Sequence, residues 1–439
     1  MTRKRNSGIA LWQKAKKIIP GGNQLLSKRA EMFLPDQWPA YYKKAKGVFV
    51  WDIDDNKYID MSIMGMGTCM LGYADDKVNA AVTKAVDDGS MATLNCPEEV
   101  ALAEKLIKLH PWAQMARFAR SGGEATAIAV RIARAFSKKD KIAFCGYHGW
   151  NDWYLAANLA DGKNLDGQLL PGLLPAGVPR ALKDSVLPFH YGKIEEFKNI
   201  AAKYGDSLGV VIMEVGRNTP DVSFLKEVQT LAKKIGAVLI FDEVSSGFRL
   251  RTGGMHILYG LEPDMTILGK AMGNGFPITA VLGKQNVMQA AQDSFISSTF
   301  WSEKVGFAAA LATIAQYEQL NVPKHLTEIG EYLGQGLKKI FLKYKLNIDI
   351  VGLAPVPTLA IKEKDALLIK TVFTQEMLKR GFLASTVIYV SYAHTKKIVD
   401  QYLEQTDEVL KTIAAAYQKK ELEKMLEGPV CHSGFSRLT

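Results

Sequence analysis

Two adjacent glycines follow an apolar run in the first third of the chain. The run is Met115–Ala119, and Ser121-Gly122-Gly123-Glu124 comes one residue later, at the start of a helical pattern. Glycine lets the backbone approach a bound group closely, and the first amides of a helix bind phosphate, so this segment is a candidate anion site. A plain strand-to-helix turn with Ser121 as the helix cap explains the same residues.

Two further segments place a chemically useful side chain directly after a short apolar run. Asp242-Glu243 follows Ala237–Phe241, where sheets of parallel strands bind ligands, although the carboxylate could instead cap the next element. Lys270 lies in the glycine-dense segment Gly269–Gly275, which suits a nucleophilic amine, whereas a solvated surface lysine is the alternative.

These three segments are expected at the same edge of one sheet. An anion site, a carboxylate at a strand end and a lysine amine together match the needs of pyridoxal phosphate (PLP). Other chemistries lack their motifs, since the sequence contains no G-x-x-x-x-G-K-[ST], no H-E-x-x-H and no G-x-S-x-G. The seven histidines show no metal-ligand spacing, and the four cysteines form no C-x-x-C pair.

Short apolar runs that alternate with amphipathic helical stretches must position these residues. This alternation predicts an α/β fold with a mostly parallel central sheet and helices on both faces. The strand candidates are Met115–Ala119, Lys141–Cys145, Leu208–Glu214, Ala237–Phe241 and Asp264–Leu268. Residues 155–192, rich in Gly, Pro, Asn and Asp, are too long for an ordinary connection and predict a functional or mobile loop.

The sequence divides into three expected parts. Residues 1–60 form an N-terminal basic arm with a hairpin, 61–310 a large PLP-binding domain and 311–439 a smaller C-terminal α/β domain. Residues 1–50 hold eleven basic and two acidic side chains, and therefore most of the net charge of +10. Such an arm could suit an anionic substrate, a membrane surface or nucleic acid. Because it lacks heavily interleaved aromatic residues, we expect a subunit contact or attraction for an anionic substrate, and neither nucleic acid nor a membrane as partner. Reduced thiols, no signal-peptide pattern and no apolar run near ~20 residues predict a cytoplasmic protein without membrane segments.

Several long motifs give the chain a family resemblance between about Lys14 and His394. It resembles the class III aminotransferases of fold type I, and within them the glutamate-1-semialdehyde 2,1-aminomutases. The motifs are IPGG (19–22), KAKGVFVWDIDDNKYIDM (44–61), SGGEATAIAVRIARAF (121–136), GYHGWND (146–152), LIFDEVSSGFR (239–249), PDMTILGKAMGNGFPITAVLG (263–283) and SSTFW (297–301).

The resemblance implies a role for each of eight residues. Lys270 would form the internal aldimine with PLP and move the substrate proton, and Asp242 would pair with the pyridine nitrogen. The amides of Gly122 and Gly123 would hold the phosphate. Val244 and Tyr147 would flank the ring, Glu214 would lie near the cofactor, and Thr299 would reach the phosphate of the neighbouring subunit in a homodimer.

The chain also departs from the family pattern. Gly123 stands where the family carries a serine or threonine, so one phosphate-binding hydroxyl is lost. Ser302-Glu303-Lys304 replaces the usual Gly-Asn/His-Pro after Thr299. The aminomutases carry a glutamate in the stretch that aligns with 385–390, which here reads STVIYV, and residues 428–439 extend beyond their pattern.

Three functional hypotheses follow. The first is a PLP-dependent aminotransferase that moves an amino group from an amino acid donor to an aldehyde or ketone acceptor, here a sugar-like or phosphorylated one. The second is an aminomutase, which transfers the group within one molecule. The third is a non-catalytic relative that binds nucleic acid through its arm, and Lys270 and Asp242 argue against it because a binding module needs neither.

Overall fold

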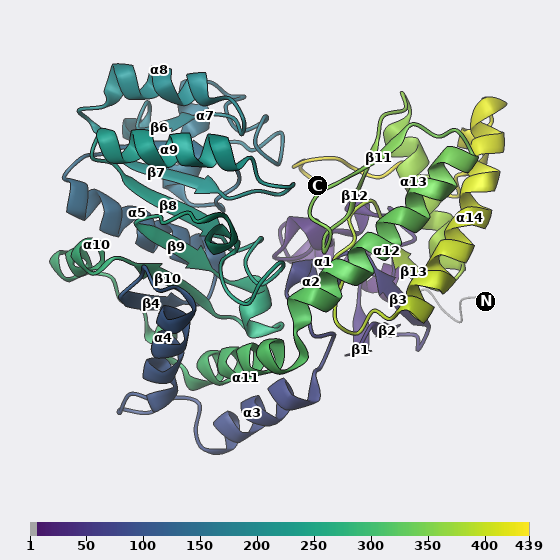
Figure 1. Ribbon diagram of the computed structural model, residues 1–439. Coiled ribbons are helices and arrows are strands. Elements are labelled where there is room, and N and C mark those ends of the chain that lie inside the picture. The colour runs from purple at the N-terminus through teal and green to yellow at the C-terminus, as the bar shows by residue number, and fades with distance from the viewer. Residues whose placement is uncertain (1–6, 439) are drawn as a thin grey trace. The chain divides into compact units, whose positions relative to one another are not determined.

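The computed structural model of the chain describes residues 7–438 (Figure 1). Two compact units make up the chain, one of Met1–Asp75 with Lys324–Thr439 and the other of Asp76–Pro323. The N-terminal segment thus belongs to the same unit as the C-terminal part, instead of standing by itself as 1–60. The reason is strand pairing, since a strand at Lys57–Met61 runs parallel to one at Phe382–Ala384.

The unit 76–323 is built on a sheet whose strand order is β4-β10-β9-β8-β7-β5-β6. Only β10 runs antiparallel to its neighbours, so β4 and β9 on either side of it point the same way as the rest. The strands are β4 Met115–Ala119, β5 Lys141–Cys145, β6 Val186–Pro188, β7 Leu208–Glu214, β8 Val238–Glu243, β9 Met265–Leu268 and β10 Thr279–Gly283. The prediction of a mostly parallel sheet is confirmed.

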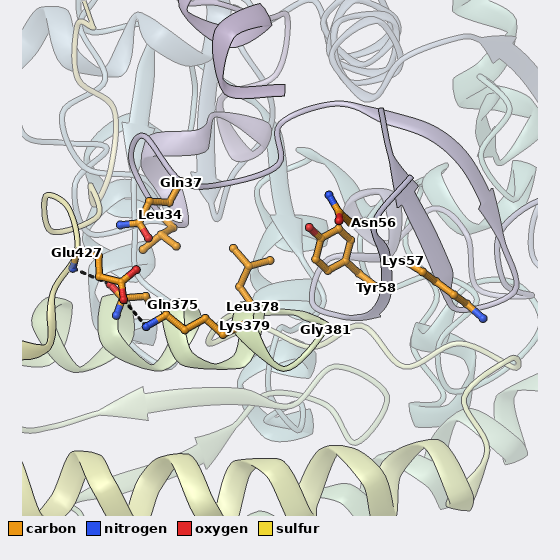
Figure 2. A pocket seen from close by; sticks show the side chains of 10 residues that line it. All are labelled: Leu34, Gln37, Asn56, Lys57, Tyr58, Gln375, Leu378, Lys379, Gly381 and Glu427. Atoms are coloured by element: carbon orange, nitrogen blue, oxygen red, sulfur yellow. Dashed lines mark hydrogen bonds and ion pairs between the residues drawn. The ribbon is translucent and has the colours of Figure 1, made fainter. Parts of the chain in front are cut away.

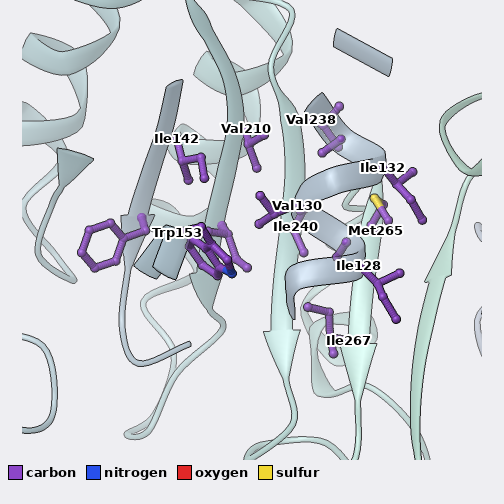
Figure 3. Close-up of a cluster of buried hydrophobic side chains, with 14 of the residues drawn as sticks. Ile128, Val130, Ile132, Ile142, Trp153, Val210, Val238, Ile240, Met265 and Ile267 are labelled. Carbon is purple, nitrogen blue, oxygen red and sulfur yellow. The ribbon is translucent and has the colours of Figure 1, made fainter. Parts of the chain in front are cut away.

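Both faces of this sheet are covered. On one face, Ile128 and Ile132 of the helix α5 (Gly122–Ser137) pack against Val210, Ile240 and other strand residues (Figure 3). The alternate residues of the same strands, such as Leu239, are buried as well, because α8 and α9 contact β5 and β8. The prediction of an α/β fold with helices on both faces is therefore also confirmed.

The longer helices are regular and mostly begin where the hydrophobic pattern starts. Their bounds are α1 Ser7–Ile18, α3 Asp76–Asp87, α4 Pro97–Leu109, α8 Ile194–Tyr204, α9 Val222–Lys234, α11 Lys304–Leu320, α12 Val322–Lys343, α13 Ala366–Lys379 and α14 Lys396–Gln418. Single-turn helices lie at α2 Met64–Gly67, α6 Asp152–Leu155, α7 Ala157–Ala160 and α10 Gln285–Met288.

The other unit holds two small sheets. One has the order β1-β2-β3-β13 and the other pairs β11 with β12. The strands are β1 Tyr42–Lys46, β2 Phe49–Asp52, β3 Lys57–Met61, β11 Ile348–Val351, β12 Thr358–Ile361 and β13 Phe382–Ala384. Since β2 and β3 pair antiparallel around residues 53–56, the predicted hairpin is present.

The described part of the basic arm is packed into this unit. Trp12 of α1 is buried in an apolar cluster with Tyr58, Leu378 and Leu383, and its indole donates to Glu31 over 3.0 Å. The last residues of the chain dock on the same region, where the guanidinium of Arg29 donates to the carbonyl of Ser436 over 2.9 Å and His432 N–H donates to the carbonyl of Glu31. Arg3, Lys4 and Arg5 lie outside the described residues.

Candidate active site

Lys270 is the second residue after β9, at the carboxyl end of the strand. Its φ of 43° lies in the left-handed region, a strained conformation that is typical of ligand sites. The amine donates to the hydroxyl of Ser245 over 2.6 Å. Burial, with the positive charges of Arg249 and Arg217, lowers the pKa of Lys270 to about 8, against the opposing charges of Glu214 and Asp242. Roughly a tenth of this amine is therefore neutral at pH 7, far more than for an ordinary lysine.

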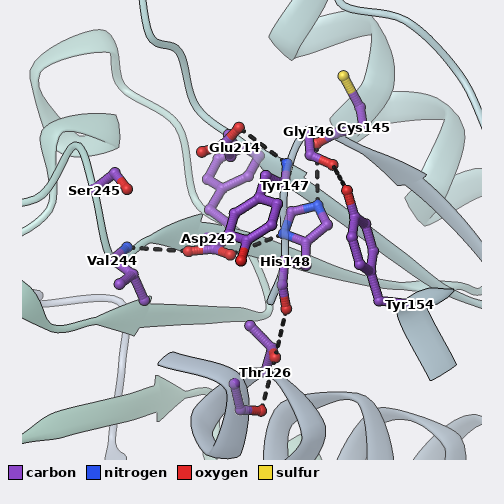
Figure 4. Close-up of polar contacts among 12 residues, drawn as sticks. Thr126, Cys145, Gly146, Tyr147, His148, Tyr154, Glu214, Asp242, Val244 and Ser245 are labelled. Atoms are coloured by element: carbon purple, nitrogen blue, oxygen red, sulfur yellow. Dashed lines mark hydrogen bonds and ion pairs between the residues drawn. The ribbon is translucent and has the colours of Figure 1, made fainter. Parts of the chain in front are cut away.

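Asp242 is the residue before the last in the neighbouring strand β8 and is buried. One carboxylate oxygen lies 2.8 Å from Nδ1 of His148, and the other accepts from the N–H of Val244 over 3.0 Å (Figure 4). Nε2 of His148 lies 3.1 Å from the carbonyl oxygen of Cys145. The imidazole of His148 is therefore held on both sides, by Asp242 and by the carbonyl of Cys145. The carboxylate is thus fixed in position at the edge where the other strands end.

The glycine pair begins α5. Ser121 and Glu124 form a capping box in which each side chain accepts from the other residue's backbone N–H, so the expected cap is present. The N–H groups of Gly122 and Gly123 occupy first-turn positions, which have no acceptor within a helix. A Cβ on Gly122 would lie 3.3 Å from a methyl group of Val244, so the helix start lies directly beside the loop after β8.

Tyr147 and Glu214 lie on the next two strand ends. Tyr147 follows β5, its backbone N–H donates to Glu214 over 3.2 Å, and its ring stands edge-on to Tyr154 at 5.8 Å. Glu214, the last residue of β7, accepts two hydrogen bonds from Arg217, over 2.8 and 2.7 Å. The ion pair of Arg217 with Glu214 therefore places one positive and one negative charge close to Lys270.

These residues fit a bound PLP. Two first-turn amides suit the phosphate, a buried carboxylate suits the pyridine nitrogen, and a lysine amine of lowered pKa suits the aldehyde. The contacts among Gly122, Val244, Asp242, Tyr147 and Glu214 bring them to the same edge of the sheet as Lys270. Thr299 lies apart from them, exposed in a single turn at 299–302, and no described contact joins it to the others.

Sequence reasoning missed four residues at this site. Ser245 accepts from Lys270, His148 holds Asp242, and Arg217 and Arg249 lower the pKa of the lysine. Two signals were available, because His148 lies within GYHGWND and Ser245 and Arg249 within LIFDEVSSGFR. Arg217 lies three residues after Glu214 and outside every motif found in the sequence.

A pocket of about 140 Å³ lies in the unit that contains the two chain ends (Figure 2). None of its residues belongs to the cluster around Lys270. Its lining is Leu34, Gln37, Asn56, Lys57, Tyr58, Gln375, Leu378, Lys379, Gly381 and Glu427. Lys379 is engaged by Glu376 at 2.7 Å and Glu427 at 2.5 Å, so this pocket offers a lysine that is already paired.

The fold is that of the fold type I PLP enzymes, and sequence comparison gives the family. The model of the family "Aminotransferase class-III" matches residues 34–414. The chain is 31% identical to 3-aminobutyryl-CoA aminotransferase of Cloacimonas acidaminovorans, over 95% of this chain and 98% of that protein. It is 33% identical to glutamate-1-semialdehyde 2,1-aminomutase of Ignicoccus hospitalis, over 92% and 99% of the two chains. The chain belongs to the class III aminotransferases.

Solved structures show the same fold. The FumI protein of Sphingopyxis sp. MTA144, determined in its PLP form, has a TM-score of 0.86 at 24% identity, covering 97% of this chain and 100% of that one. The protein is therefore a PLP-dependent enzyme that transfers an amino group from a donor to a carbonyl acceptor. Among residues 7–438, no helix is long and apolar enough to cross a membrane.

Proposed function

We propose that Lys270 is the catalytic amine of this aminotransferase and that the cluster around it is the PLP site. The observation that carries this proposal is the environment of Lys270. Its amine is bound by the hydroxyl of Ser245 at 2.6 Å, and its pKa is lowered to about 8. A lysine that loses its proton easily can both attack a carbonyl and carry a proton during the reaction.

When bound, PLP supplies an electron-withdrawing ring that stabilises negative charge on the α-carbon of the substrate. Asp242 keeps the pyridine nitrogen protonated, and His148 holds that carboxylate in place. The amides of Gly122 and Gly123 bind the phosphate at the start of α5. Tyr147 and Val244 would flank the ring, with Glu214 near the cofactor, and Lys270 would be the group that moves the substrate proton.

The substrates we propose are an amino acid donor and an aldehyde or ketone acceptor. One relative is named 2'-deamino-2'-hydroxyneamine transaminase, at 29% identity over 87% of this chain, which supports a sugar-like acceptor. The purified protein should be yellow, an amino donor alone should bleach it, and a carbonyl acceptor should restore the colour. A protein that no amino donor bleaches would contradict transfer between two substrates.

Intramolecular transfer is the second candidate, because several relatives at 30–34% identity are named glutamate-1-semialdehyde 2,1-aminomutase. The stretch 385–390 supports the two-substrate reaction, since STVIYV lacks the aminomutase glutamate. Supplying glutamate-1-semialdehyde without any amino donor separates the two. Formation of 5-aminolevulinate in that assay would establish the aminomutase, and its absence is the result we expect.

We further propose that the enzyme works as a homodimer in which Thr299 reaches the phosphate bound to the neighbouring subunit. Two neighbouring segments of the unit 76–323 expose large apolar side chains, since Leu94, Phe295 and Phe300 are 83%, 87% and 67% exposed. The segments are joined by the hydrogen bond from Lys304 N–H to the carbonyl of Ser90. An apolar surface of this kind is typical of a subunit interface.

The mass of the particle in solution tests the dimer. Leu94→Asp with Phe300→Asp should give a monomer by light scattering, because burying two carboxylates without partners opposes association. Leu342→Asp is the matched control, since Leu342 is 79% exposed on α12. A double variant that remains dimeric would contradict the proposed interface.

Cellular location is proposed from the thiols. All four cysteines lie in the described part of the chain and none forms a disulfide. Free thiols are typical of the reducing cytoplasm, and we propose that the enzyme acts there. Detection of the enzyme in a secreted fraction would contradict this location.

A further inference from the structure

The space beside Gly123, which a serine or threonine side chain would enter, is taken by the side chain of Trp150. A Cβ built on Gly123 would lie 2.9 Å from the indole nitrogen of Trp150 and 3.2 Å from its neighbouring ring carbon. The indole thus occupies the space in which a serine or threonine side chain would begin. That space adjoins the first-turn amides of α5, where we place the phosphate.

The loop that carries Trp150 is held tightly against the helix start. The side-chain amide of Asn151 donates to the carbonyl of Gly123, and Thr126 donates to the carbonyl of His148 over 3.0 Å. Gly149 has a φ of 103°, and a Cβ there would lie 3.2 Å from the Cα of Gly123. Only a glycine at 149 allows the two backbones to approach this closely.

The indole N–H itself is available to a ligand. Trp150 is 69% exposed, which is a large fraction for a tryptophan, and within residues 7–438 no group accepts a hydrogen bond from its nitrogen. An indole nitrogen is a donor only, so it suits a phosphate oxygen and no cation. By contrast, Trp301 on the same unit already donates to Glu124 over 3.2 Å.

We propose that Trp150 is a phosphate-binding residue of this enzyme and that its indole N–H replaces the hydroxyl missing at Gly123. The inference rests on the proposed PLP site at the start of α5. It makes Trp150 and Gly123 a matched pair, in which a small residue at 123 leaves room for the ring at 150. A hydroxyl at 123 and the indole at 150 in its present position exclude each other.

The first experiment removes the donor and keeps the ring. Apoenzyme of Trp150→Phe should bind PLP about tenfold more weakly, since a hydrogen bond to a charged group contributes about that factor. Binding is followed by the absorbance of the cofactor, independently of turnover. Pyridoxal, which lacks the phosphate, should bind wild type and variant equally. Trp153→Phe is the control, because Trp153 lies three residues further along in α6 and its buried indole nitrogen has no hydrogen-bond partner among the described residues.

The second experiment exchanges the donors. Gly123→Ser alone should weaken PLP binding, because its Cβ would lie 2.9 Å from the indole nitrogen. In a Trp150→Ala background the same substitution should strengthen binding and recover most of the lost affinity. The effect of serine therefore changes sign with the residue at 150, which general destabilisation does not produce.

The outcomes separate this inference from the function on which it rests. If wild-type apoenzyme fails to bind PLP, the proposed site is wrong. If wild type binds PLP and Trp150→Phe binds it equally well, or loses pyridoxal affinity by the same factor, the role of Trp150 is overturned. Equal effects of Gly123→Ser in both backgrounds would overturn it too.

Discussion

Lys270 and Lys379 lie in different units, and each is surrounded by polar side chains. Lys270 binds the hydroxyl of Ser245 and lies near two arginines, and burial lowers its pKa to about 8. Burial also disfavours the charged form of Lys379, but hydrogen bonds with Glu376 and Glu427 outweigh it and raise the pKa of that amine. Lys270 therefore loses its proton readily, whereas Lys379 retains its proton.

This difference shows that a hollow in the surface is a poor guide to chemistry here. The pocket beside Lys379 has a volume of about 140 Å³, yet its lysine is already paired with two carboxylates within 2.7 Å. At Lys270, the carboxylate of Asp242 is engaged by His148 instead, and Glu214 is engaged by Arg217. Asp242 and Glu214 each have another partner, so neither forms an ion pair that would hold the proton on Lys270.

Replacing each lysine with alanine should give the largest contrast. Lys270→Ala should remove the yellow colour and lower transamination by at least about 10³-fold, because both attack on the carbonyl and proton transfer depend on this amine. Lys379→Ala should keep colour and rate. Absorbance and a coupled rate assay measure both, with circular dichroism to check folding. A yellow Lys270→Ala protein would refute the assignment.

Neutralising the carboxylate beside Lys270 should have the next largest effect. Asp242→Asn should lower the transamination rate about a hundredfold, as expected when one fixed electrostatic partner of the reacting group is lost. Asp264→Asn is the matched control, since Asp264 precedes β9 and binds Lys284 at 2.8 Å. Similar rates for the two variants would mean that Asp242 serves stability alone.

The pH dependence of cofactor uptake should show a smaller but diagnostic effect. Only the neutral amine has a free lone pair, so the uptake of PLP by apoenzyme should rise about tenfold per pH unit below the pKa and level off above it. The lowered pKa of Lys270 places that change near pH 8. Arg217→Gln should move it to higher pH, because a positive charge that lowers the pKa is removed. A midpoint near the ordinary lysine value would contradict the proposed environment.

Most strands of the seven-stranded sheet could be predicted from the sequence because of how they are buried. Parallel strands buried on both faces are continuous apolar runs, and Met115–Ala119, Lys141–Cys145 and Leu208–Glu214 are strands with the predicted bounds. β10 and β6 were missed. β10 is a five-residue strand within the motif 263–283, and β6 is three residues long within the irregular segment 155–192.

From the sequence, only those residues of the site that lie at the end of a predicted strand could be placed. Lys270, Asp242 and the glycine pair each follow a strand, so their common edge follows from topology. Ser245, His148 and Arg217 act through the direction of a side chain, which no periodicity encodes. The roles of the eight predicted residues stay predictions until the variants above are measured.

The parallel pairing of β3 with β13 has a consequence for the order of synthesis. Ile59 pairs with Phe382, so the first unit cannot close until nearly the whole chain has left the ribosome. At typical rates of protein synthesis that wait is on the order of half a minute. During this time Trp12 and Tyr58 lack Leu378 and Leu383, the later-made residues of their cluster. The unit 76–323, continuous in sequence, can fold first and carry the unfinished N-terminal segment until its partner strand emerges.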